Sequence, residues 1–130
     1  MKSLRRLLLI HAVITFAAGV VLIVAPQQIP KAVTIRLPHD AYLIAYLLGA
    51  AELALAFLSF QSRALTDAKS LRLICFAFII FHAASAAVEL YAIAQGASIK
   101  VWGNVALRIL MIILFFYYGV RNLKIAHSGN

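Results

Sequence analysis

Residues 71–95 read LRLICFAFIIFHAASAAVELYAIAQ, an apolar run long enough to cross a lipid bilayer as one helix. A spanning helix needs roughly 20 residues, within a range of about 17–25. The run ends before Gly96, a residue type that suits the left-handed C-terminal cap of a helix. Every backbone donor must be satisfied within the segment at this depth, so an open strand is not an alternative.

Three further apolar segments have the same character, and they cover residues 7–25, 41–60 and 101–120. The first segment stops at Pro26, which cannot continue a helix, and it is longer than the roughly 7–15 apolar residues of a signal peptide. The second follows Asp40, a residue type that caps helix N-termini. We therefore predict an all-α integral membrane protein, with residues 1–130 forming one up-down-up-down four-helix bundle.

The composition of the chain agrees with a membrane protein. Of the 130 residues, 65% are hydrophobic and 12% are charged, where soluble proteins carry roughly 25% charged residues. The single cysteine excludes a disulfide within the chain. The net charge of +8 does not indicate nucleic-acid binding, because no basic stretch is long enough to follow a phosphate backbone.

Basic residues are distributed unequally between the two ends of the predicted bundle. Eight lie at the end that holds both termini, and three lie at the opposite end. The eight are Lys2, Arg5, Arg6, Arg63, Lys69, Arg72, Arg121 and Lys124, and the three are Lys31, Arg36 and Lys100. Since cytoplasmic loops carry the excess of Lys and Arg, we predict a bacterial inner-membrane protein with both termini in the cytoplasm.

Six of the polar or ionisable side chains in the predicted spans are the most informative for function. They are His11, Glu52, His82, Glu89, Asn104 and Arg108. An ionisable group at mid-bilayer costs roughly 2.5–3.5 kcal/mol on insertion scales, so it normally faces a partner or water. Each of the four segments contributes at least one of the six, which is hard to attribute to accident.

Depth along the helices separates these residues into two groups. With a rise of about 1.5 Å per residue, Glu89 and Arg108 come out about 8–9 Å below the outer end of their helices. Glu52 and His82 come out near 17–18 Å, and His11 comes out near 21 Å. We therefore expect an outer ion pair and a separate middle cluster.

The outer group has a structural interpretation, in which Glu89 and Arg108 neutralise each other and Asn104 completes the hydrogen bonds.

The middle group allows more than one chemical role. Glu52 has no basic partner other than histidine, so it must be protonated, hydrated or bonded to His82. A carboxyl and an imidazole in such a site suit proton exchange or the binding of a small polar ligand. A satisfied hydrogen-bond network is the alternative.

A cofactor at the middle group is a further alternative. His11 and His82 are suited to ligate a haem, or to join Glu52 in a two-histidine, one-carboxylate metal site. The spacing of these residues is specific to neither a haem nor a metal, so we predict no cofactor and no metal.

Motifs of soluble enzymes, from the P-loop to H-E-x-x-H, are absent, and the loops leave no room for a catalytic domain. A non-enzymatic role is therefore favoured.

The second span contains the small-residue stretch Gly49-Ala50-Ala51-Glu52, followed by an apolar run over 53–60 and a basic inner loop. Together with the total length and the four closely spaced spans, this stretch resembles the DoxX-like group of small bacterial four-helix membrane proteins. The resemblance implies an accessory role in membrane redox assemblies and quinone-dependent sulfur oxidation. The histidines, Glu89 and Arg108 match no pattern of that group, so the resemblance transfers no active site.

Three functions follow as hypotheses. In the leading one, Glu52, His82 and His11 bind or pass a proton or a small polar ligand. In the second, the protein is an accessory subunit of a quinone-linked redox or lipid-modifying complex. In the third, the polar residues serve helix pairing only. The lipid bilayer is the expected partner, together with a homo-oligomer or larger membrane complex, since four short helices leave little room for a pore.

Overall fold

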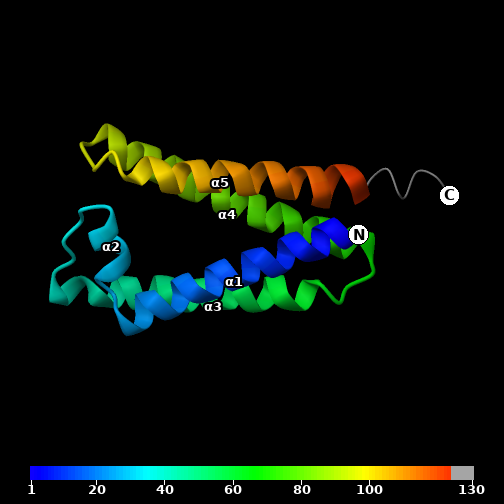
Figure 1. Ribbon diagram of the computed structural model, residues 1–130, viewed down its shortest axis with the longest axis horizontal. Coiled ribbons are helices and arrows are strands. Elements are labelled where there is room, and N and C mark those ends of the chain that lie inside the picture. Colours follow the sequence, from blue (N-terminus) through cyan, green and yellow to red (C-terminus); the bar gives the residue numbers. More distant parts are fainter. Residues whose placement is uncertain (124–130) are drawn as a thin grey trace. The chain divides into compact units, whose positions relative to one another are not determined.

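The computed structural model describes residues 1–123, so Lys124, one of the basic residues used to predict topology, lies outside the described part. The four long helices are α1 (Lys2–Val24), α3 (Tyr42–Ser62), α4 (Ala68–Ala94) and α5 (Val101–Phe115). A π-helical segment, η2 (Phe116–Arg121), continues α5, and two short helices, α2 (Gln28–Ala32) and η1 (His39–Ala41), lie between α1 and α3 (Figure 1). Four helical segments are long and apolar enough to cross a membrane. The predicted all-α class with four spans is confirmed.

The C-terminal ends of the long helices follow the residues that the sequence marks as helix breakers. α1 ends at Val24, two residues before Pro26. α4 ends at Ala94, and Gly96 then adopts a φ of 95°, in the region that glycine tolerates. Its backbone N–H donates to the carbonyl of Ile93, which satisfies one of the last acceptors of the helix.

The N-terminal ends of α1 and α4 differ from the prediction, whereas α3 and α5 begin at or within one residue of it. Asp40 caps no helix, because it lies inside the η1 turn, which no side chain caps. The capping aspartate is Asp67, whose carboxylate accepts hydrogen bonds from the backbone N–H groups of Lys69 and Ser70, so α4 begins at Ala68 rather than at residue 71. α1 begins at Lys2, since Lys and Arg are good helix formers and extend the helix beyond the apolar run.

One compact unit comprises residues Leu8–Gln61. Within it α1 and α3 run antiparallel (Figure 1). Gly19 and Gly49 mark their close approach. A Cβ atom added to either glycine would lie 2.9 Å from the carbonyl oxygen of the other. Two facing glycines therefore let the helix backbones pack directly against each other, as small residues do between membrane helices.

The other compact unit comprises Met1–Leu7 and the chain from Ser62 onward. Here α4 and α5 run antiparallel side by side (Figure 1). Their core contains the rings of Phe78 and Phe115, whose centroids are 5.1 Å apart. Gly119 in η2 packs so closely on Cys75 that a Cβ atom there would overlap the sulfur. These contacts set the register that brings the polar side chains of α4 and α5 together.

Candidate functional site

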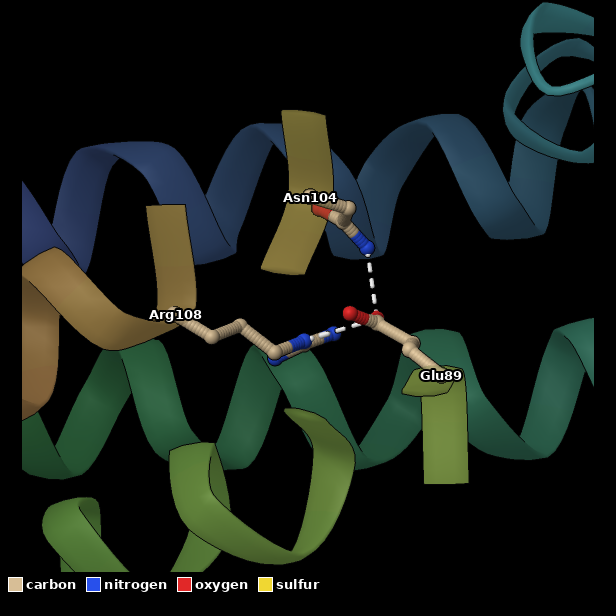
Figure 2. Close-up of polar contacts among 3 residues, drawn as sticks. All are labelled: Glu89, Asn104 and Arg108. Atoms are coloured by element: carbon tan, nitrogen blue, oxygen red, sulfur yellow. Dashed lines mark hydrogen bonds and ion pairs between the residues drawn. The ribbon is translucent and has the colours of Figure 1, made fainter. Parts of the chain in front are cut away.

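Glu89 of α4 receives two side chains from α5. Arg108 Nε donates to Glu89 Oε1 at 2.8 Å, and Asn104 Nδ2 donates to the same oxygen at 2.7 Å. Figure 2 shows both residues reaching the carboxylate from successive turns of α5. The i, i+4 spacing of Asn104 and Arg108 places them on one face of their helix, opposite Glu89.

The ion pair is largely shielded from solvent. The side chains of Arg108 and Glu89 are 18% and 17% exposed, and the Arg108 guanidinium carbon lies 5.6 Å from the centroid of the Phe81 ring. Glu89 Oε2 is shielded and makes no hydrogen bond within residues 1–123. Arg108 is thus held between α4 and α5 by charge neutralisation and a cation–π contact.

His11 of α1 forms a polar contact with a serine of α3. His11 Nδ1 lies 3.1 Å from Ser59 Oγ, and Ser59 Oγ donates to the carbonyl oxygen of Leu8 at 2.9 Å. Both side chains are buried, with exposed fractions of 1% for His11 and 0% for Ser59. Thr15, one turn along α1, is also buried and donates to the carbonyl of His11 at 2.7 Å.

These two contacts assign the tautomer of His11. The serine hydroxyl has one hydrogen, and the carbonyl of Leu8 can only accept, so the hydroxyl hydrogen is directed to that carbonyl. Ser59 must then accept from His11, which places a hydrogen on Nδ1. In the neutral imidazole this tautomer makes Nε2 the acceptor atom of the ring.

Glu52 of α3 is buried, with 8% of its surface exposed. It lies seven residues before Ser59, so the two side chains share one face of α3. Seven residues correspond to about 10.5 Å along the helix axis. The His11–Ser59 contact thus places Glu52 about two turns from His11, a wider separation than the depths estimated from sequence imply. The difference arises because the closely packed helices fix their own register, which segment ends do not reveal.

His82 of α4 is buried among aromatic rings in the other unit, with 5% of its surface exposed. Its imidazole is nearly parallel to the ring of Phe115, with centroids 6.3 Å apart and an angle of 18°. The Phe81 ring meets it edge-on at 5.3 Å. The aromatic surroundings restrict the orientation of the imidazole and exclude solvent from most of its surface.

Of the sequence-predicted residues, the structure brings Glu89, Asn104 and Arg108 together. His11 and Glu52 lie in one compact unit and His82 lies in the other. Within residues 1–123 no group of three or more His, Cys, Asp and Glu side chains is arranged to hold a metal ion. Ser59, which contacts His11, is not among the predicted site residues, and its i, i+7 relation to Glu52 is the signal that the sequence offers.

Comparisons with known proteins give no assignment: no protein-family model, curated protein or solved structure matches the chain. The chain is a four-helix protein with four long apolar helices, and it is a multi-pass membrane protein by the length and composition of those helices.

Proposed function

We propose that the protein binds or transfers a proton, or holds a small polar ligand, within its membrane-spanning helices through Glu52, His11 and His82. The observation that carries this proposal is their burial: each is at most 8% exposed, in helices apolar enough to span a bilayer. An ionisable side chain at such a position is costly and marks a functional site by default. The Glu89–Arg108 ion pair, in contrast, accounts for its own burial by mutual neutralisation.

The chemistry of each residue supports a proton-active role. In the tautomer inferred above, Nε2 is the basic atom of the His11 imidazole, while Ser59 holds the ring through Nδ1. Glu52 supplies a carboxyl group on the face of α3 that also carries Ser59. His82 supplies a second imidazole whose orientation Phe115 and Phe81 restrict. A carboxyl and two imidazoles are the side chains most often used to exchange protons near neutral pH.

Proton flux into liposomes that contain the purified protein tests this proposal. We expect Glu52→Gln to fold normally and to lose pH-driven flux, because glutamine keeps the shape of the acid but cannot exchange a proton. His11→Gln and His82→Gln should reduce the flux as well. His39→Asn is the matched control, because His39 is exposed and lies in η1. Flux that is unchanged in folded Glu52→Gln would contradict the proton-active role and favour a purely structural one.

A second candidate is the accessory role implied by the DoxX-like resemblance, in a quinone-linked complex of the bacterial inner membrane. It is supported by a groove of about 420 Å³ between α1 and α3, lined by apolar side chains only. The lining includes Phe16, Phe57 and Phe60, which suit the isoprenoid tail of a quinone. A photoreactive quinone should label this groove, and Phe57→Ala should reduce the labelling. Equal labelling of the variant would exclude the groove as a quinone site.

A further inference from the structure

A cavity of about 580 Å³ lies at the N-terminal end of α4. Its lining consists of Lys69, Ser70, Arg72, Leu73 and Phe76. Four of these residues, at positions 69, 72, 73 and 76, follow i, i+3, i+4, i+7 spacing and therefore share one face of the helix. The cavity thus joins two cationic side chains to two apolar ones along a single helix face.

The cationic half of the cavity has donors that the described chain does not use. Neither Lys69 nor Arg72 forms an ion pair or a side-chain hydrogen bond within residues 1–123, and Arg72 Nε is shielded from solvent. The neighbouring acid, Asp67, caps the helix by accepting from the backbone of Lys69 and Ser70 and from the Ser70 hydroxyl. The positive charge at the cavity therefore suits an anionic group.

The apolar residues of the cavity lie at the depth of the lipid acyl chains. α4 has 27 residues and is about 40 Å long, roughly 10 Å longer than the hydrocarbon core of a bilayer. When the helix is centred in the bilayer, about 5 Å at each end lies at headgroup level. Lys69 then lies among the headgroups. Leu73 and Phe76, which are 72% and 41% exposed, lie below them among the acyl chains.

We propose that this cavity is a binding site for an anionic phospholipid. Lys69 and Arg72 hold the phosphate, and Leu73 and Phe76 contact the first part of an acyl chain. Basic side chains at a membrane surface attract anionic lipids, and the flanking apolar residues distinguish a lipid from a soluble anion. This site is separate from the proton-active residues of the proposed function, and its test is independent of them.

Native mass spectrometry of the full chain in detergent, with phosphatidylglycerol and phosphatidylcholine of identical acyl chains, tests this proposal. We expect preferential retention of phosphatidylglycerol. Lys69→Gln and Arg72→Gln should each weaken it about fivefold, the effect of one basic residue near an anionic surface. Phe76→Ala should weaken retention of the lipid as well. These side chains line an open cavity rather than the core, and a thermal melt of each variant verifies the fold.

Arg121→Gln is the matched control, because it removes the same charge at the same end of the α4–α5 pair, where Arg121 lies over the ring of Tyr117. We expect this variant to keep phosphatidylglycerol. Equal loss in Arg121→Gln and Arg72→Gln would overturn the site in favour of general charge attraction. Equal retention of both lipids by the wild type would also overturn it. Displacement of the lipid by inorganic phosphate would assign the cavity to a soluble anion instead.

Discussion

For the single residue Glu89, the hydrogen bonds from the two α5 side chains are both accepted by the same carboxylate oxygen, Oε1. Arg108 and Asn104 both donate to Oε1, and the ring of Phe81 lies near the guanidinium. The carboxylate is therefore the shared partner of both α5 side chains. Its removal leaves a cation in an apolar setting, whereas the loss of Asn104 still leaves the ion pair intact.

We predict that Glu89→Gln and Arg108→Gln each lower the thermal stability of the protein in detergent. Removing one partner of a buried ion pair often costs about 3–5 kcal/mol, because the other charge remains in a low-dielectric site. The double substitution should cost less than the sum of the two single ones. Asn104→Ala is the milder comparison. Melting temperatures that stay at the wild-type value in both single variants would mean that the pair does not form in the folded protein.

At the scale of helices, the close approach of α1 and α3 depends on two glycines. We predict that Gly19→Ala and Gly49→Ala destabilise the protein by about 1–3 kcal/mol, the usual effect of overpacking a well-filled site. A methyl group at either position would press on a backbone carbonyl, which cannot rotate away. Gly103→Ala in α5 is the control, since a Cβ atom there meets nothing within 4 Å.

Thermal melts of the three alanine variants measure the effect. Gly103→Ala should match or exceed the wild type, because alanine favours a helix by up to about 1 kcal/mol over glycine. If Gly19→Ala and Gly49→Ala behaved like Gly103→Ala, the helices would not meet at this crossing.

The long helices were predictable because apolar length and helix breakers act locally. Pro26 and Gly96 end helices through their own backbone chemistry, so the sequence marks these ends well. Helix starts were less predictable, because basic residues continue a helix as readily as apolar ones, which extends α1 back to Lys2. Asp40 and Asp67 are the same residue type in similar contexts, and only the surrounding backbone decides which of them caps a helix.

The polar contacts were predictable only in part. Counting residues along each helix places Glu89 and Arg108 at similar depth, where their opposite charges attract each other. The two residues form an ion pair in the structure. The i, i+7 relation of Ser59 to Glu52 indicates a shared helix face, but it does not identify Ser59 as the residue that contacts His11. The register between α1 and α3, which places Ser59 beside His11, depends on packing of the whole helix pair.

At the scale of the whole molecule, the distribution of basic residues leads to a prediction of topology. We expect both termini to lie in the cytoplasm and the loop that contains α2 and η1 to lie on the opposite side. Reporter fusions after Asn130 and within residues 27–39 measure this directly. A fusion after Asn130 that reports from the periplasm would contradict the predicted orientation.

In the proposed function, the buried carboxyl group of Glu52 exchanges a proton inside a membrane-spanning helix. Infrared difference spectra of the reconstituted protein, recorded between acidic and alkaline buffer, detect this exchange directly, because the chain has only four Asp and Glu residues. We predict a protonated-carboxyl band that changes with pH, disappears in Glu52→Gln and persists in Asp40→Asn, which removes an exposed acid. Identical pH-difference spectra for the wild type and a folded Glu52→Gln variant would contradict the account.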